Sequence, residues 1–343
     1  MKKMVMAATM IVLATLTNAA EPVVEVLVGP RGANPGNKVV PSKLNYPFGV
    51  DFDAVGNMII VEYKGGRIFK RTPAGDLLHI GGLGRAGYEG DGGPVAKASF
   101  KDMHNVAIGP SGSLFISDHA NHAIRRVDSK GNISTYAGGK AGFAGDGETV
   151  KHAKFNMVIS VSINQDKKYL LVADIKNHRI RRITLASGRV ETVAGNGQRG
   201  VPVDGANATT APLVDPRAAA YDAAGNLYIV ERGGNALRVV DTKGKVRTVA
   251  GSGKKGKADG VGQKATLNGP KHLAIDSAGA VYIADDNNHL VRCFDPKTGA
   301  LTTVLGGGEF KLNRPHGVQV YDNWLYIADS WNHRIVRLKL AKK

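Results

Sequence analysis

The chain has 343 residues, of which 46 are Lys or Arg and 29 are Asp or Glu, so its formal net charge is +17. This positive excess favours an anionic partner or surface. Cys293 is the only cysteine, which excludes an intrachain disulfide framework and leaves the hydrophobic core to hold the fold.

Residues 1–20 are expected to be a secretory signal peptide. Lys2 and Lys3 form a basic start, Val5 to Leu16 an apolar segment, and Ala19 and Ala20 offer a small-residue cleavage site. The apolar segment is too short to span a bilayer, and no later segment qualifies. We therefore expect residues 21–343 to form one exported, soluble domain without a transmembrane anchor, either periplasmic or extracellular.

An acidic residue recurs six times along this domain, each time after a short apolar run. Its spacings are 56, 56, 57, 54 and 44 residues. The six anchors are Glu62, Asp118, Asp174, Glu231, Asp285 and Asp329, and in four of them an Asn-His pair follows three residues later. A period of this size indicates an array of supersecondary units.

The second unit, residues 105–139, shows what each repeat contains. Four short runs rich in branched and aromatic residues begin at Asn105, Leu114, Ile124 and Ile133, and turns rich in Gly, Asn, Asp and Ser separate them. This pattern predicts a four-stranded antiparallel meander, and no part of it has the length and period of a helix.

Six such meanders can bury both faces of each sheet only when they stand around a common axis. The sequence therefore predicts an all-β fold, a six-bladed β-propeller of four-stranded antiparallel blades. The sixth unit ends after three strands, and Val24 to Val28 resembles the fourth strand of other units. We expect this N-terminal strand to close the last blade, which removes an open sheet edge.

The repeat resembles the NHL-repeat family of propellers, and Asn288-His289-Leu290 is the tripeptide that gives that family its name. The resemblance extends over nearly all of the mature chain and implies the propeller fold. It implies no single activity, because the family includes sensors, RNA regulators, enzymes and extracellular modules.

Two further patterns are predicted to be structural. An Arg seven residues after the acidic anchor, as in Asp118 and Arg125, should pair with it across a turn, and the Asn-His pairs should bond to backbone groups. Asp-Gly loops such as Asp91-Gly92 and Asp146-Gly147 link the blades. Turn formation is the simpler interpretation of these loops, with calcium binding as the alternative.

Candidate functional residues lie where the repetition fails, at the start of each first strand. In a propeller these starts meet at one mouth of the central channel. Basic residues and histidines occur there in five places: His104, Arg217, Lys271, His272 and His316. Arg and Lys suit a carboxylate or phosphate, whereas His can bind a metal or act as a base. His272 lies one residue out of phase, so its side chain is expected on the other face of its strand.

The sequence favours an exported binding module that holds an anionic ligand at this mouth. The ligand would be a small molecule, a glycan or a component of the cell envelope, and a protein partner is an open alternative. The alternative function is a metal-dependent hydrolase or lyase with its site at the same mouth. The family resemblance suggests lactonase-like or peptidyl-hydroxyglycine-lyase-like chemistry for it, and no cofactor is firmly implied beyond a zinc or calcium ion. Nucleic acid is disfavoured, because aromatic residues for base stacking are sparse.

Overall fold

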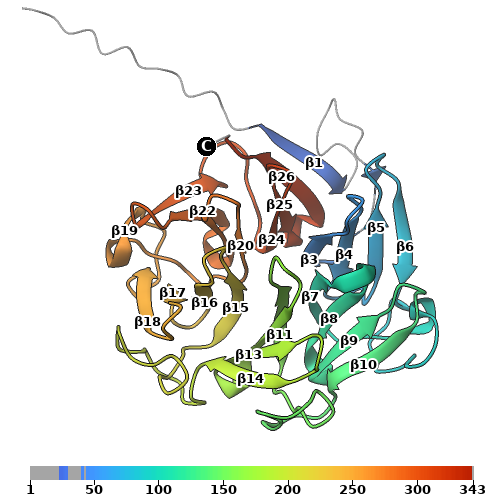
Figure 1. Ribbon diagram of the computed structural model, residues 1–343. Coiled ribbons are helices and arrows are strands. Elements are labelled where there is room, and N and C mark those ends of the chain that lie inside the picture. Colours follow the sequence, from blue (N-terminus) through green and yellow to red (C-terminus); the bar gives the residue numbers. More distant parts are fainter. Residues whose placement is uncertain (1–22, 30–39, 42–43, 342–343) are drawn as a thin grey trace, which may run out of the picture.

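The computed structural model describes residues 23–29, 40–41 and 44–341. Six antiparallel sheets stand around a central axis, and the first strand of each lies nearest the axis (Figure 1). The predicted six-bladed β-propeller is therefore confirmed. The predicted signal peptide lies outside the described residues.

The strands of each blade follow one another as a meander. Blades one to three consist of β3 (Pro47–Phe52), β4 (Met58–Glu62), β5 (Ile68–Arg71) and β6 (Leu77–Gly81); β7 (Met103–Ile108), β8 (Leu114–Asp118), β9 (Ala123–Val127) and β10 (Ile133–Gly138); and β11 (Val158–Ile163), β12 (Tyr169–Asp174), β13 (Arg179–Thr184) and β14 (Val190–Ala194). Blades four and five consist of β15 (Pro216–Tyr221), β16 (Leu227–Glu231), β17 (Ala236–Val240) and β18 (Val246–Ala250); and β20 (Leu273–Ile275), β21 (Val281–Asp285), β22 (Leu290–Asp295) and β23 (Ala300–Leu305), with β19 (Gly260–Val261) on the outer edge.

Both ends of the described chain contribute to blade six. Its strands are β24 (Pro315–Tyr321), β25 (Trp324–Asp329), β26 (Arg334–Lys339) and β1 (Val24–Gly29), with β2 (Val40–Pro41) parallel to β1. β1 pairs with β26 in the antiparallel sense, with Val26 opposite Val336, and the two strands lie side by side in Figure 1. The N-terminal strand completes the last blade, as predicted, and so removes the open edge that β26 would otherwise present.

The core lies between neighbouring blades rather than at a single centre. Six clusters of buried apolar side chains each fill the space between two adjacent sheets. The cluster between blades one and two, for example, joins Val61 and Ile68 to Phe100, Met103 and Ile116. Each blade is therefore stabilised by both of its neighbours, so the core is complete only when the circle of blades is closed.

Among the described residues, all helices are 3-10 turns of three residues. They are η1 (Val95–Lys97), η2 (Pro110–Gly112), η3 (His119–Asn121), η4 (Ile175–Asn177), η5 (Gly262–Lys264), η6 (Asp286–Asn288) and η7 (Ser330–Asn332). None of these helices in the described part of the chain has the length and hydrophobicity that crossing a bilayer requires.

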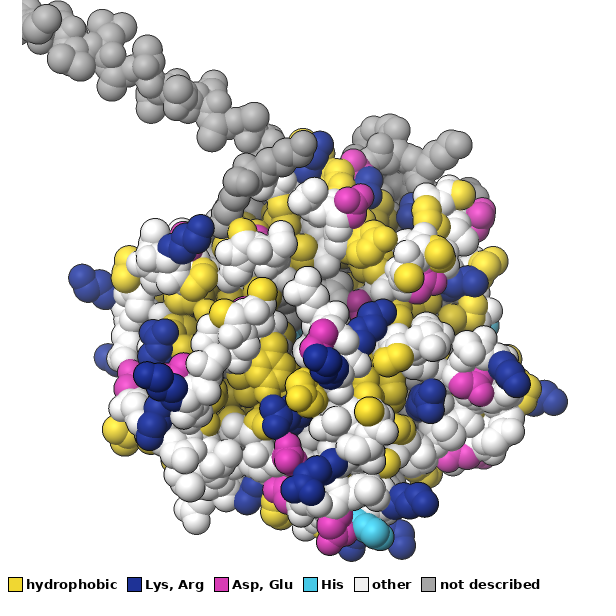
Figure 2. Space-filling model, viewed as in Figure 1, with side chains coloured by type: hydrophobic (Ala, Val, Ile, Leu, Met, Phe, Trp, Pro, Cys, Tyr) yellow, Lys and Arg dark blue, Asp and Glu magenta, His cyan; other side chains and the backbone are white. Residues whose placement is uncertain are grey.

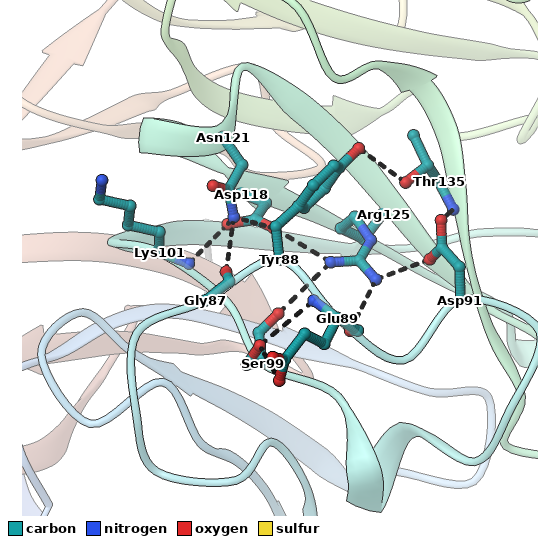
Figure 3. Close-up of polar contacts among 10 residues, drawn as sticks. All are labelled: Gly87, Tyr88, Glu89, Asp91, Ser99, Lys101, Asp118, Asn121, Arg125 and Thr135. Atoms are coloured by element: carbon teal, nitrogen blue, oxygen red, sulfur yellow. Dashed lines mark hydrogen bonds and ion pairs between the residues drawn. The ribbon is translucent and has the colours of Figure 1, made fainter.

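The predicted pairing of acidic anchor and arginine is present in blade two (Figure 3). Arg125 is almost wholly buried, and its Nη1 donates to Asp118 Oδ2 at 3.2 Å. Its Nη2 donates to Asp91 Oδ1 at 2.6 Å, and Asp91 Oδ2 accepts a bond from the Thr135 backbone N–H. The aspartate of the Asp-Gly loop is thus a second counter-ion, a role that the sequence did not reveal.

The same arrangement recurs around the ring. Arg181 lies 2.7 Å from Asp146 and 3.6 Å from Asp174, and Arg292 lies 2.7 Å from Asp259 and 3.0 Å from Asp285. Arg238 pairs with Glu231 at 2.7 Å. In blades one and six the arginine comes five residues after the anchor instead, as Arg67 and Arg334. These buried pairs fix how the turn after each second strand meets the loop that links the blades.

Three of the four histidines of the Asn-His pairs connect one blade to the next, whereas His178 Nδ1 has no hydrogen-bond partner in the described structure. His122, His289 and His333 adopt the left-handed conformation. The Nδ1 atom of His122 accepts a hydrogen bond from the Met157 backbone N–H at 3.0 Å, and that of His289 accepts one from Arg314 at 3.2 Å. Their repeated contacts with backbone groups are structural, as expected.

Basic side chains are distributed over the surface. On the face shown in Figure 2, Lys and Arg are scattered among acidic residues and do not form one continuous patch. The net charge alone therefore does not locate a binding site on this face.

Candidate functional site

The predicted site residues at the starts of the first strands form a ring around one end of the axis. Its members are Phe48, His104, Ile159, Arg217, Lys271 and His316, and all are buried, with at most 8% of the residue exposed. We call this set the axial ring. The sequence predicted that these positions converge. The axial ring contains four of the five predicted residues: His104, Arg217, Lys271 and His316.

Positive charge is concentrated in the axial ring. Arg217 Nη2 donates to His316 Nε2 at 2.9 Å, and Lys271 Nζ lies 3.8 Å from Asp286 Oδ2. Asp286 also binds Arg314, with 2.7 Å between Oδ2 and Nη2. One buried carboxylate thus serves Arg314 and Lys271 together, while Arg217 has no carboxylate partner among the described residues.

Burial shifts the ionisation of both cations. It lowers the pKa of Arg217 to about 9, with the nearby Arg232 adding to the shift. Burial, followed by the charge of Arg217, lowers the pKa of Lys271 to about 6. A fixed anion in this space would counter both effects, because an opposite charge favours the protonated form.

The histidines of the axial ring are held neutral. Burial and the charge of Arg217 lower the pKa of both His104 and His316 well below the ordinary value. Because His316 Nε2 accepts from Arg217, its proton lies on Nδ1, as inferred from this contact. That Nδ1 and Arg217 Nε are buried and have no hydrogen-bond partner in the described structure. The Nε atoms of the structural arginines Arg125, Arg181 and Arg292 are unpaired as well, so His316 Nδ1 is the more distinctive of these two donors.

Aromatic rings pack beside these donors. Phe48 stacks on His316 with 3.8 Å between ring centroids and on Tyr63 with 4.4 Å. The centroids of the His104 and His316 rings are 5.4 Å apart. The site therefore combines an aromatic wall with a basic one.

Further site residues come from the turns after the second strands, which the sequence analysis did not single out. The position following each acidic anchor differs from blade to blade and lies beside the axial ring. It is occupied by Tyr63, His119, Ile175, Arg232, Asp286 and Ser330. His119 stacks against His104 at 4.4 Å, and Asp286 binds Lys271. The same search for failed repetition, applied one residue after the anchor, would have found them.

His272 is the predicted site residue that lies apart from the others. Its Nε2 accepts a hydrogen bond from Asn105 Nδ2 and its Nδ1 donates to the Val318 carbonyl at 3.1 Å. It lines a cavity of about 910 Å³ that occupies the opposite half of the channel. This position agrees with the expectation that the His272 side chain leaves the other face of its strand. It does not agree with the grouping of His272 with the other four predicted site residues.

The axial ring fits a divalent metal poorly. The lone pair that His316 Nε2 would offer a metal accepts a bond from Arg217, and the cation Lys271 faces the same space. Across the described residues, no group of three or more His, Cys, Asp and Glu side chains is arranged to hold a metal ion. The Asp-Gly loops fit calcium equally poorly, because Asp91, Asp146 and Asp259 each face a buried arginine.

Comparison with known proteins agrees with the fold. The family model for the NHL repeat matches residues 267–294. The chain is 28% identical over 340 residues to Protein SUPPRESSOR OF QUENCHING 1, chloroplastic, of Arabidopsis thaliana, covering 90% of this chain and 31% of that protein. It is 26% identical over 349 residues to NHL repeat-containing protein 2 of Gallus gallus, covering 88% and 48%. The chain spans less than half the length of both relatives.

Solved structures show the same architecture at lower identity. An auxiliary nutrient binding protein from Bacteroides ovatus is 15% identical, with a TM-score of 0.68 over 94% of this chain and 77% of that chain. A gluconolactonase from Xanthomonas campestris is 13% identical, with a TM-score of 0.61 over 87% of each chain. Likeness at this level shows the fold alone. The chain is therefore a six-bladed β-propeller that carries the NHL repeat and resembles NHL repeat-containing proteins over most of its length.

Proposed function

We propose that this protein is an exported binding module that holds an anionic ligand at the axial ring. The observation that carries the proposal is a pair of buried basic side chains next to donors that have no partner. Arg217 and Lys271 are buried beside a single carboxylate, Asp286, which already binds Arg314. The N–H groups of Arg217 Nε and His316 Nδ1 have no partner in the described structure.

A carboxylate or phosphate group suits this arrangement. The guanidinium group of Arg217 presents several donors in one plane, and the Lys271 ammonium adds a point charge that an anion would stabilise. The neutral His316 can donate a further hydrogen bond from Nδ1. Because Tyr63 stacks on Phe48 and is partly exposed, the rest of the ligand would contact the Tyr63 ring.

The comparisons support a binding role only in outline. The auxiliary nutrient binding protein from Bacteroides ovatus shares the fold, which is consistent with a propeller that presents a ligand site. A small acidic molecule, an acidic glycan and a phosphate-bearing envelope component all present the required group. A metal-dependent hydrolase or lyase has less support, because the charge of Arg217 opposes a bound metal and its Nη2 occupies the Nε2 lone pair of His316.

The proposal is tested by calorimetric titration of the chain lacking residues 1–20 with phosphate, citrate and a sulfated polysaccharide. At least one of these anions should bind at low salt and bind more weakly as salt rises, because charge pairing is screened. Arg217→Gln should weaken that binding about tenfold or more, the loss of one charged hydrogen bond.

Lys271→Met provides a second variant, and Lys243→Gln provides the matched control. Lys243 lies on an exposed turn between β17 and β18, away from the axis. Its substitution should leave anion binding unchanged. Absence of binding by all three anions at low salt, or equal affinity in folded Arg217→Gln and Lys271→Met proteins, would show that the axial ring is not an anion site.

A further inference from the structure

The central channel contains a second polar cavity, separated from the axial ring by Asn105 and His272. It has a volume of about 910 Å³ and is lined by the first strands of all six blades. At its rim lie the turns that follow those strands, among them Asn164, Asp222, Ser277 and Asn323. Because the first strands begin at the axial ring and end at these turns, the cavity opens on the opposite face of the propeller.

Two side chains from opposite blades form the inner end of this cavity. Asn105 belongs to blade two and His272 to blade five, and Asn105 Nδ2 donates to His272 Nε2 across the axis. The blades are closely packed at this level. A Cβ atom on Gly49 would lie 2.8 Å from Asn105 Cα, and one on Gly317 would lie 2.3 Å from the Phe48 carbonyl oxygen. The channel is therefore narrowed here, and the cavity ends on polar groups.

The walls present a carboxylate, carboxamides and a hydroxyl. Asp51 Oδ1 accepts a bond from Gln319 Nε2 at 2.6 Å, and Asp51 Oδ2 accepts one from the Ile108 backbone N–H at 2.7 Å. Ser162 donates to the Ala219 carbonyl at 2.6 Å. Asp51, Gln319 and Ser162 line the cavity and are partly exposed, unlike the buried residues of the axial ring. These groups are held in fixed positions and face open space.

Two of the aspartates that line the cavity are already satisfied by their own turns. Asp222 and Asp276 each accept hydrogen bonds from backbone N–H groups of their own turns. Lys167 lies close enough to Asp51 to lower the pKa of that carboxyl, against the larger effect of burial, which raises it. His272 is neutral, since burial lowers its pKa to about 4. The cavity therefore lacks the cation excess that an anion needs, since aspartates outnumber the one lysine in its lining.

An aromatic surface completes the lining. Phe52 and Tyr321 stack with ring centroids 4.3 Å apart, and both residues line the cavity. The wall therefore presents both aromatic and polar groups, and β3 and β24 contribute to each. A ligand with one hydrocarbon face and an edge of hydroxyl groups matches this arrangement, because hydroxyls both donate and accept hydrogen bonds.

We propose that this cavity is a second binding site, for a neutral polyhydroxylated ligand of the size of a mono- or disaccharide. The carboxylate of Asp51 and the carboxamides of Gln319 and Asn105 bind the hydroxyl edge, and the Phe52–Tyr321 pair contacts the hydrocarbon face. Its volume lies within the range of about 300–1,000 Å³ that is usual for small-molecule sites. This site goes beyond the anion site, because its chemistry and its face of the propeller are both different.

Saturation-transfer NMR on the chain lacking residues 1–20, with glucose, maltose and N-acetylglucosamine as probes, tests the proposal. At least one sugar should receive magnetisation from the protein. Gln319→Leu removes a carboxamide with little change in volume, and Ala220→Leu narrows the cavity without removing a polar group. Each substitution should weaken sugar binding about tenfold or more, Gln319→Leu through the loss of a hydrogen bond and Ala220→Leu through the loss of space for the ligand.

Lys243→Gln is again the matched control and should leave sugar binding unchanged. Thermal unfolding of each variant shows whether it is folded. One folded variant is enough for a comparison of sugar binding with the wild-type chain. The proposal is wrong if none of the three sugars binds, or if the folded variants bind them as the wild-type chain does. It is also wrong if spermidine or phosphate displaces the bound sugar, since either would indicate a charged ligand for this cavity.

Discussion

Asn105 and His272 come from opposite blades and hydrogen-bond to each other across the axis of the propeller. They separate two regions of the channel that differ in chemistry. The axial ring on one side is buried, basic and aromatic, whereas the cavity on the other side is open and lined by carboxylates, carboxamides and hydroxyls. The hydrogen bond therefore joins two opposite blades of the propeller and also separates the two regions of its central channel.

A double-mutant cycle on this pair should reveal the contact. Asn105→Ala and His272→Ala should each lower the free energy of unfolding. The double variant should lose less than the sum, with a coupling free energy of about 1 kcal/mol, the usual value for one hydrogen bond. Chemical denaturation measures all four proteins. Asn105→Ala combined with the remote Lys243→Gln should be additive, and additivity in the first cycle as well would argue against a stabilising bond.

Removing the acidic anchor of blade two should be costly. Asp118→Ala removes one of the two carboxylates that Arg125 contacts, so the buried guanidinium group is left partly unpaired. Breaking a buried ion pair costs about 3–5 kcal/mol. Denaturant unfolding gives the free energy. Glu148→Ala, in an ion pair whose side chains are more than half exposed, is the matched control and should change it by no more than about 0.5 kcal/mol. Equal effects of the two substitutions would mean that the recurring pairs do not stabilise the blades.

The sequence was sufficient to predict the architecture, because the same local pattern occurs six times. The acidic anchor and its arginine are close in sequence, so Asp118 and Arg125 were recognisable as a pair. Asp91 lies 34 residues from Arg125, and its role as second counter-ion depends on how the loop between blades folds back. The prediction of a turn at Asp91-Gly92 is correct for the glycine, whose φ is +82°. It did not include the contact between Asp91 and Arg125.

The sequence does not predict which way the side chains point at the start of each first strand. A register shift interrupts β7 between Met103 and Val106, and similar shifts occur in β3, β11, β15 and β24. Simple alternation of side chains fails at such a bulge. His104 and Asn105 consequently both lie near the axis, one in the axial ring and the other at the end of the cavity. Spacing in the sequence gives no information about such a local irregularity.

Closure of blade six by β1 predicts how the chain responds to truncation. A chain that begins at Glu21 should fold, whereas one that begins at Pro30 lacks β1 and leaves the edge of β26 exposed. Val26, Leu27 and Val28 are buried, and their loss should cost roughly 5 kcal/mol or more at about 1.5–3 kcal/mol for each side chain. Thermal unfolding and light scattering measure the effect. Equal unfolding midpoints for the two chains would contradict a closing role for β1.

Lys271 should give the protein a stability that rises with pH. Its pKa is about 6 in the folded chain and about 10.4 when unfolded, so between these values the unfolded state binds more protons. The free energy of unfolding should then increase with pH, by up to about 1.4 kcal/mol per pH unit for one proton. Lys271→Met should remove this contribution and be more stable than the wild-type chain at pH 7. Denaturant unfolding between pH 6.5 and 9.5 measures both slopes, and parallel profiles for the two proteins would mean that Lys271 stays charged in the axial ring.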